Sequence, residues 1–370
     1  MKIELNKISQ GPTLAKASLL FLLFLVGCGS SPIATTPIST AEIVAQVNSI
    51  VDANTTSNQA GIVVILRKNG NVIYKRAAGM ADIANNIPLT TNTKFQIAST
   101  SKPFTAVAIM QLVDRKLLTL DDSIIKFLPE LSINWFPIKI RHLLSHQSGI
   151  PDYLTTDSVT NKVPWLNGLT NNDLLSFYVA NQNLNFTPGT STEYSSTNFA
   201  MLAEIIGRAS GMPFYQYIAT QIFAPSGMTN SYIVNDPTHQ NDSVAINFGK
   251  NVVPYGANMQ TYGGIGQFSS AEDISSFATA LFSGSLLSQN SFNEMVQARA
   301  TFPASNQTYG YGWYVDAVNG YKYLDHAGTL DGYRSIIRFL DNNSDDVIIL
   351  CNGGQLRVAR QILAVVDKGL

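Results

Sequence analysis

Charged side chains are scarce in this sequence. They make up 13% of the 370 residues, the formal net charge is -1, and no run of lysine and arginine is longer than two residues. Proteins that bind nucleic acid carry a basic surface that neutralises phosphates, so we expect no nucleic-acid partner. Hydrophobic residues account for 45% of the chain, which predicts a globular protein with a large core.

Patterns of two other site classes are also missing. No Gly-x-Ser-x-Gly segment occurs, which argues against an α/β-hydrolase with a Ser-His-Asp triad. His142 and His146 are four residues apart, as two metal ligands on a helix would be, but no glutamate follows His142 and no third ligand is evident. We therefore interpret both histidines as structural and expect no metal.

The first 28 residues predict a targeting segment. Three lysines lead to an apolar stretch at 17–26 that is too short to span a bilayer. The following Leu-Val-Gly-Cys28 resembles the lipobox of bacterial lipoproteins, in which the cysteine becomes the lipidated first residue of the mature chain. A plain secretory signal or a short anchor is the alternative. Residues 29–38 then predict a flexible tether, and the implied location is the bacterial cell envelope, on the periplasmic or outer face.

The sequence contains only one other cysteine, Cys351. No disulfide partner remains for it once Cys28 is lipidated, so the hydrophobic core has to stabilise the fold. Because Cys351 ends an apolar run at 347–350, we interpret it as a buried small hydrophobic side chain rather than a reactive thiol.

Local patterns predict strands near both ends of the chain and helices between them. The capping box Ser39-Thr-Ala-Glu42 predicts a first helix, and Ser269-Ser-Ala-Glu272 predicts one that continues to residue 282. Strands are predicted at 61–66, 72–76, 310–316, 321–325, 335–340 and 347–351, and further helices at 138–145, 172–181, 198–210 and 355–367.

This order of elements predicts an α+β fold. One antiparallel sheet is flanked by the N- and C-terminal helices, and an all-helical lobe is inserted into it. We expect a single domain at 39–370, with an α/β lobe at about 39–98 and 300–370 and a helical lobe at about 99–299. A cleft between the lobes is the natural place for a site.

Ser99 and Lys102 lie three residues apart where an apolar helix is predicted to begin. This spacing places the two side chains on one helix face, a single turn apart, so the amine can reach the hydroxyl. A serine needs a neighbouring base to act as a nucleophile, and a helix N-terminus offers N–H groups to a developing oxyanion. We therefore interpret Ser99 as a covalent nucleophile.

The same spacing occurs a second time, at Ser123-Ile-Ile-Lys126. This copy lies in a charged, surface-like segment, so we interpret Ser123 as an ordinary residue at the start of a helix. A chain of this composition is expected to contain the pattern about once or twice by chance. The spacing alone is weak evidence, and the rest of the chain has to support Ser99.

Two further stretches contain groups that suit such a nucleophile. Tyr194 follows a Pro-Gly turn and precedes a predicted helix together with Ser196, and a buried ammonium nearby is expected to lower the pKa of the phenol. Packing of the tyrosine ring is the simpler alternative. His326 and Gly328 lie in a strand-like run, where the glycine would allow a substrate to approach the backbone closely.

The set of these three motifs resembles that of the penicillin-recognising serine hydrolases. This superfamily includes class C β-lactamases, D-alanyl-D-alanine carboxypeptidases, D-aminopeptidases and family VIII esterases. The resemblance covers about residues 41–355 and includes further segments in family order: Leu118-Thr-Leu-Asp-Asp122, His142-Leu-Leu-Ser-His146-Gln-Ser-Gly149-Ile-Pro-Asp-Tyr153, Met201-Leu-Ala-Glu-Ile-Ile206, Gly263-Gly264 and Gly310-Tyr-Gly-Trp313.

The resemblance implies a role for each motif. Ser99 is acylated, Lys102 and Tyr194 share its proton and pass it to the leaving group, and the backbone N–H groups of Ser99 and Thr329 hold the oxyanion. His326 takes the place where class C β-lactamases have lysine. No metal or other cofactor is implied, and the substrate is a small molecule or a short peptide.

One residue departs from the family pattern. Most β-lactamases and carboxypeptidases of the superfamily have asparagine where this chain has Ser196, and a hydroxyl cannot make the same pair of amide contacts. Arg334 is a candidate for binding a substrate carboxylate or a solvated loop residue. Asp152, Tyr153 and Trp165 are candidates for the cleft mouth or for packing.

We therefore expect a lipid-anchored serine hydrolase that cleaves a D-amino-acid peptide or ester bond. The alternatives are a functional class C-like β-lactamase and a non-catalytic lipoprotein that binds cell-wall peptide with the same fold. The intact set Ser99, Lys102 and Tyr194 argues against the non-catalytic alternative, because binding alone requires no nucleophile.

Overall fold

The computed structural model describes residues 37–154, 168–239, 242–246, 260–318, 320–330, 332–340 and 345–369. The predicted signal segment with Cys28, most of the tether, and Trp165 lie outside these residues. Within the described ranges, no helix has the length and apolar character needed to cross a membrane.

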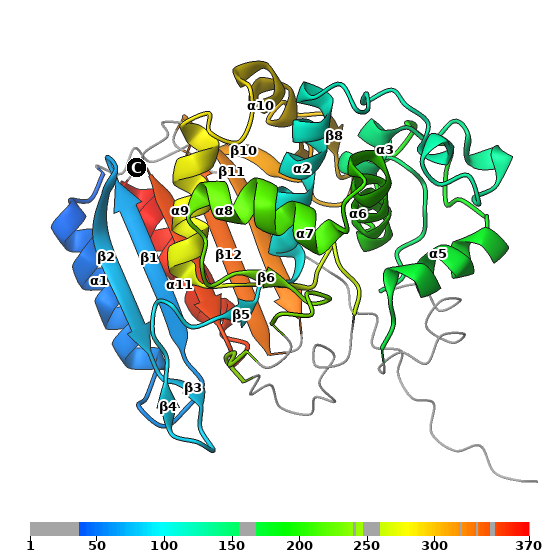
Figure 1. Cartoon of the computed structure of the whole chain (residues 1–370). Helices are drawn as coiled ribbons and strands as arrows, with labels where there is room; N and C mark the ends of the chain where they lie inside the picture. The colour runs from blue at the N-terminus through cyan, green and yellow to red at the C-terminus, as the bar shows by residue number, and fades with distance from the viewer. Residues whose placement is uncertain are drawn as a thin grey trace, which may run out of the picture.

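An eight-stranded antiparallel sheet is the centre of the α/β lobe (Figure 1). Its strand order is β2-β1-β13-β12-β11-β10-β9-β8, so strands from both ends of the sequence pair in the middle of the sheet. The strands are β1 Ile62–Lys68, β2 Asn71–Ala78, β8 Ala300–Thr301, β9 Thr308–Tyr309, β10 Tyr314–Val318, β11 Tyr321–Leu330, β12 Tyr333–Leu340 and β13 Asp346–Cys351. The predicted α+β fold is confirmed.

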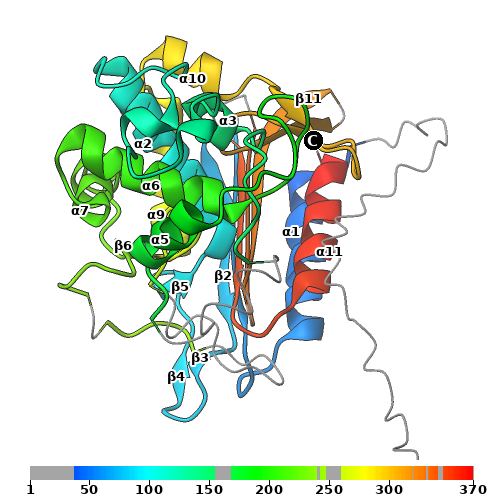
Figure 2. The same ribbon diagram turned by 90° about the vertical axis from the view of Figure 1, so that its right-hand side faces the viewer.

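Two terminal helices, α1 (Thr40–Asn54) and α11 (Leu356–Val366), cover one face of the sheet (Figure 2). The predicted capping box starts α1, because the Ser39 hydroxyl accepts the Glu42 N–H and the Glu42 carboxylate accepts the Ser39 N–H. Cys351 lies in the core beneath these helices, where burial raises the pKa of its thiol to about 12. It is the inert apolar side chain that the sequence predicts.

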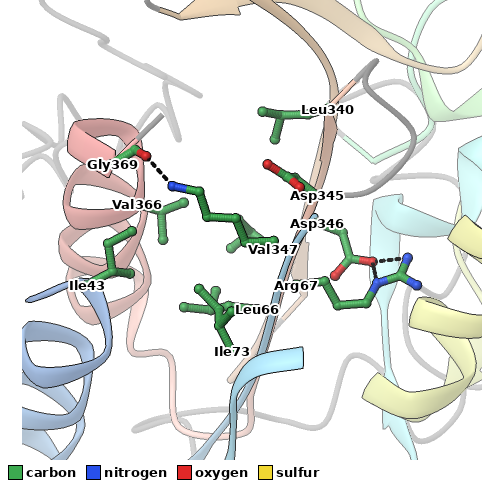
Figure 3. A pocket seen from close by; sticks show the side chains of 11 residues that line it. Ile43, Leu66, Arg67, Ile73, Leu340, Asp345, Asp346, Val347, Val366 and Gly369 are labelled. Atoms are coloured by element: carbon green, nitrogen blue, oxygen red, sulfur yellow. Dashed lines mark hydrogen bonds and ion pairs between the residues drawn. The ribbon is translucent and has the colours of Figure 1, made fainter. Parts of the chain in front are cut away.

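A small cavity of about 20 Å³ lies on this same side of the sheet (Figure 3). It is lined by apolar side chains of both helices and of β1, among them Ile43, Leu66 and Val366, and Arg67 pairs with Asp346 at its edge. A space of this size has room for no more than about one water molecule. It is a packing gap rather than a ligand site.

The helical lobe covers the opposite face (Figure 2). Its central helix is α2 (Lys102–Asp114), whose residues 102–112 are all buried, as the apolar character of nearly every face predicts. The other helices on this side are α3 Ile140–Leu144, α5 Asn171–Ala180, α6 Ser196–Ser210, α7 Phe214–Ile218, α8 Ala224–Ser226, α9 Ala271–Phe282 and α10 Gln289–Met295, of which α6, α7 and α10 pack against α2.

Two local predictions are wrong by a few residues. Helix α9 is capped by Ser270, whose hydroxyl accepts the Asp273 N–H, while Ser269 ends the short strand β7 (Gln267–Ser269). Adjacent serines followed by adjacent acidic residues offer two capping registers, and pairing of Ser269 with Phe95 selects the second. The predicted strand at 310–316 is interrupted, because residues 310–313 turn between β9 and β10.

Candidate active site

Ser99 lies in a tight turn that leads into α2. The short strand β5 (Phe95–Gln96) is followed by a 3₁₀ turn, η1 (Ala98–Ser101), and α2 begins at Lys102. Ala98 has a φ of 51°, a conformation that alanine seldom adopts, so the backbone is strained directly before Ser99. The predicted geometry of one turn is present, because Lys102 Nζ lies 3.3 Å from Ser99 Oγ.

The Lys102 amine is fully enclosed, with 0% of the side chain exposed. Its Nζ donates to the Gly264 carbonyl at 2.9 Å, lies 3.3 Å from Ser196 Oγ and sits 4.8 Å from the centre of the Tyr194 ring. Burial disfavours the ammonium and lowers the pKa of Lys102 to about 7. A large fraction of neutral amine is therefore present beside Ser99 near neutral pH.

Tyr194 lies just before α6, with its ring stacked on His146 at 4.3 Å between centres. Burial raises the pKa of the Tyr194 phenol well above 10, although its hydrogen bond with Ser99 acts in the opposite direction. The expectation that the nearby amine lowers this pKa is wrong, because the loss of hydration outweighs it. Tyr194 is a protonated phenol at neutral pH.

His326 lies in β11 within a group of aromatic rings, 6.5 Å from the Tyr194 ring between centres. Its Nδ1 is 3.1 Å from the Ala327 carbonyl, which fixes the proton on Nδ1, so Nε2 accepts from the Tyr309 hydroxyl at 3.1 Å. Burial and the positive charge of Lys102 lower the pKa of His326 to about 3. The ring is therefore neutral, and its hydrogen bonds lead to Tyr309 and its own strand.

Gly328 brings β11 against the turn that carries Ser99. A Cβ at this position would lie 2.1 Å from the Ile97 carbonyl oxygen and 2.2 Å from Ser335 Oγ. These atoms are already joined, since Ser335 Oγ donates to the Ile97 carbonyl at 2.6 Å. The lack of a side chain at Gly328 thus allows the turn that carries Ser99 to pack against β11. The sequence analysis instead expected this glycine to allow a substrate to approach.

Thr329 lies on a stretch of β11 that, within the described ranges, pairs with a strand on one side only. Strand β10 pairs with β11 no further than Asp325, whereas β12 pairs with it as far as Leu330. Successive residues of a strand direct their N–H groups to opposite sides, so half of those at 326–330 face the unpaired edge next to η1. This edge is where a substrate carbonyl can meet backbone donors.

Arg334 does not point toward Ser99. Neighbouring residues of a strand point to opposite faces of the sheet, and Ser335, the next residue of β12, contacts the turn that carries Ser99. Arg334 therefore lies on the other face, where it pairs with Cys351 beneath α11. Its guanidinium donates to the carbonyls of Leu330 and Tyr333 at 3.2 and 2.6 Å. The geometry therefore does not support the suggestion that Arg334 binds a substrate carboxylate.

The family model described as Beta-lactamase matches residues 47–367. The chain belongs to the beta-lactamase family. Among curated relatives, penicillin-binding protein 4* of Bacillus subtilis (strain 168) is 28% identical over 304 residues, covering 75% of this chain and 65% of that protein. The putative penicillin-binding protein PbpX of the same strain is 31% identical over 299 residues, covering 79% and 70%. The chain thus spans less than two thirds of the first relative.

Solved structures give the same result. The octameric penicillin-binding protein homologue from Pyrococcus abyssi superimposes with a TM-score of 0.76 at 25% identity, covering 89% of this chain and 77% of that one. The D-amino acid amidase from Ochrobactrum anthropi SV3 shares the fold, with a TM-score of 0.73 at 22% identity over 89% and 99% of the chains. The resemblance seen in the sequence is confirmed for both the family and the fold.

Two residues to which the sequence assigned no catalytic role lie beside this beta-lactamase-family site: His146, interpreted as structural, and Asp152, a candidate for the cleft mouth or for packing. His146 follows α3 with a φ of 59°, so it leaves the helix that His142 occupies, and its Nδ1 accepts the Ser195 N–H at 3.1 Å. Asp152 is buried behind α6. Both contacts join residues that are more than 40 positions apart in the sequence, so no local pattern predicts them, and the family segment from His142 to Tyr153 was the one signal for both residues. In the part of the chain that the structure describes, no group of three His, Cys, Asp or Glu side chains is arranged to hold a metal.

Replacement of Tyr194 by phenylalanine removes only the phenol oxygen and keeps the ring stacked on His146. We expect a loss of about 10²- to 10⁴-fold in kcat for ester hydrolysis, the range for losing a positioned acid or base. Circular dichroism and steady-state kinetics measure fold and activity together.

Tyr217→Phe is the matched control, because the Tyr217 hydroxyl is buried in α7 and has no hydrogen-bond partner among the residues that the structure describes. We expect this variant to retain wild-type kinetics. A Tyr194→Phe variant as active as Tyr217→Phe would remove the phenol from the mechanism.

Proposed function

We propose that this protein hydrolyses a D-amino-acid peptide or ester bond through an acyl-enzyme on Ser99. The observation that carries the proposal is the approach of Lys102 Nζ to Ser99 Oγ, at 3.3 Å, in a setting where burial lowers the pKa of the amine to about 7. A base beside a nucleophile, ready to accept a proton at neutral pH, is the arrangement that acyl transfer requires.

The pKa directions at Lys102 and Tyr194 support an order of proton transfers. Neutral Lys102 accepts the Ser99 proton while Oγ attacks the substrate carbonyl, and the N–H groups of Ser99 and Thr329 stabilise the oxyanion. The protonated Tyr194 phenol donates to the leaving group and is reprotonated by the Lys102 ammonium. Water then attacks the acyl carbonyl while Lys102 accepts its proton, the bond between the acyl carbon and Ser99 Oγ breaks, and the Lys102 ammonium returns the proton to Oγ. In this order of transfers Lys102 is the general base, whereas the sequence alone did not distinguish between Lys102 and Tyr194 for that role.

Ser196 supports a peptide or an ester over a β-lactam as substrate. Its hydroxyl lies 3.3 Å from Lys102 Nζ, in the place where most β-lactamases and carboxypeptidases of the superfamily have asparagine. A hydroxyl cannot give both an acceptor and two donors to an acyl side chain. The shared fold of the D-amino acid amidase is consistent with a D-amino-acid substrate.

A panel of p-nitrophenyl esters, D-Ala-D-Ala peptides and cephalosporins tests the substrate class on the full chain. We expect esters or D-peptides to give the highest kcat/KM. If cephalosporins give it instead, the protein is a functional class C-like β-lactamase. If no compound is turned over and fluorescent penicillin leaves no covalent adduct, the protein is a non-catalytic cell-wall-binding lipoprotein.

We further propose that a lipid on Cys28 anchors the enzyme in the bacterial cell envelope, on the periplasmic or outer face, where short peptides or small molecules reach it. The lipobox-like Leu-Val-Gly-Cys28 and the tether at 29–38 support this location. Cys28→Ser is expected to move the protein from the membrane fraction to the soluble fraction and to abolish labelling by an alkyne fatty acid. Unchanged labelling would exclude Cys28 as the lipid site.

A further inference from the structure

Asp152 is a buried carboxylate that the proposed reaction leaves without a role. It lies between α3 and α5, and 6% of its surface is exposed. Its Oδ1 accepts the Ser196 N–H at 3.1 Å and the Leu154 N–H at 3.2 Å. The first bond joins Asp152 to the first residue of α6, two residues after Tyr194. The carboxylate thus lies at a helix N-terminus, where its negative charge is favourable.

Ser196 connects this carboxylate to the Lys102 amine. Its backbone N–H binds Asp152, and its hydroxyl lies 3.3 Å from Lys102 Nζ. The two buried groups also influence each other electrostatically, since the carboxylate raises the pKa of Lys102 and the amine lowers the pKa of Asp152, each against the larger effect of burial. A buried charge is costly unless an opposite charge and hydrogen bonds accompany it.

The other groups that face Lys102 are uncharged. They are the Ser99 and Ser196 hydroxyls, the Gly264 carbonyl, the Tyr194 and Phe199 rings, and the imidazoles of His146 and His326. Burial lowers the pKa of both histidines, so they stay neutral. Glu193, Tyr153, Tyr178 and Tyr194 face Asp152, and the three phenols are protonated. Among the described residues, Asp152 is the anion that acts on the pKa of Lys102.

We propose, building on the function proposed above, that Asp152 is a positioning residue of the reaction. Its carboxylate holds the N-terminus of α6 in place. Its negative charge also stabilises the Lys102 ammonium each time the amine accepts a proton. When Ser99 attacks, its proton moves to Lys102, and the ammonium that forms is stabilised by a carboxylate that is already in position. No rearrangement of solvent is needed at that moment.

The test is the pH dependence of Asp152→Asn. The amide keeps an oxygen for the Ser196 N–H but removes the charge, and with it the contribution that raises the pKa of Lys102. Neutral amine then persists at lower pH, so the acidic limb of kcat/KM shifts to lower pH by about 1 unit or more. The limb is measured from about pH 5 to about pH 9 with a p-nitrophenyl ester and, independently of any substrate, as the rate of fluorophosphonate labelling of Ser99.

Two variants separate this role from a structural one. Asp152→Glu retains the charge and is expected to return the limb to the wild-type position. Asp273→Asn removes another buried carboxylate, which lies in the first turn of α9 and accepts the Asn230 N–H and the Ser231 hydroxyl. This variant is expected to leave the acidic limb unchanged. If Asp152→Asn does not fold, Asp152→Ser, which also keeps an acceptor oxygen without the charge, is measured in its place.

An acidic limb at the wild-type pH in the uncharged variant overturns the inference, even if kcat falls. A wild-type protein that is neither active nor labelled overturns the proposed function instead. The two failures are therefore distinguishable.

Discussion

Replacement of Ser99 by alanine is expected to abolish ester hydrolysis. The variant keeps the turn before α2 but has no oxygen to attack the substrate, so Lys102 Nζ loses the group that lies 3.3 Å away. Loss of a nucleophile of this kind costs about 10⁴-fold or more in kcat, and what remains comes from binding and from the oxyanion donors. Steady-state kinetics with a p-nitrophenyl ester, alongside thermal unfolding, measures the effect.

Ser123→Ala is the control that the sequence itself provides. Ser123 has the same three-residue spacing to Lys126, but its hydroxyl donates to the Phe136 carbonyl at 2.7 Å and Lys126 pairs with Asp122 at the surface. We expect this variant to retain wild-type activity. Equal activity of the Ser99 and Ser123 variants would refute the mechanism.

Replacement of Lys102 by methionine is expected to have the second large effect. Methionine fills nearly the same buried space and removes the amine that accepts the Ser99 proton. We expect kcat to fall by about 10²- to 10⁴-fold, the contribution of a positioned base. The rate of fluorophosphonate labelling of Ser99 is expected to fall in parallel, because it depends on the same proton transfer.

Lys126→Met is its control, since the Lys126 side chain is more than half exposed and belongs to the second Ser-x-x-Lys copy. We expect no change in kcat or in labelling. Labelling of the Lys102 variant at the wild-type rate would show that another group activates Ser99.

Much of the fold follows from the sequence because its signals are local. The capping box at Ser39 and the apolar faces of α2 arise within one helix, and the alternating strands at both ends of the chain predict the antiparallel sheet. The start of α9 was misplaced by one residue, because Ser269 and Ser270 are equivalent as caps until β7 pairs with β5.

The sequence predicts less of the site where burial determines the protonation state of a residue. The spacing of Ser99 and Lys102 is local, and the structure has it. The direction of the Tyr194 pKa depends on how completely α6, β11 and the rings around it exclude water, which no motif encodes. Asp152 reaches Ser196 across 44 residues of chain, so its contact with α6 is a product of tertiary folding.

The most direct test of the central claim is to locate the covalent adduct. The full chain is incubated with a fluorophosphonate, digested and mapped by mass spectrometry. The account predicts one adduct per molecule, on the peptide that contains Ser99, with no adduct in Ser99→Ala and an unchanged adduct in Ser123→Ala. An adduct on any other residue, or ester turnover by a protein that takes up none, would contradict it.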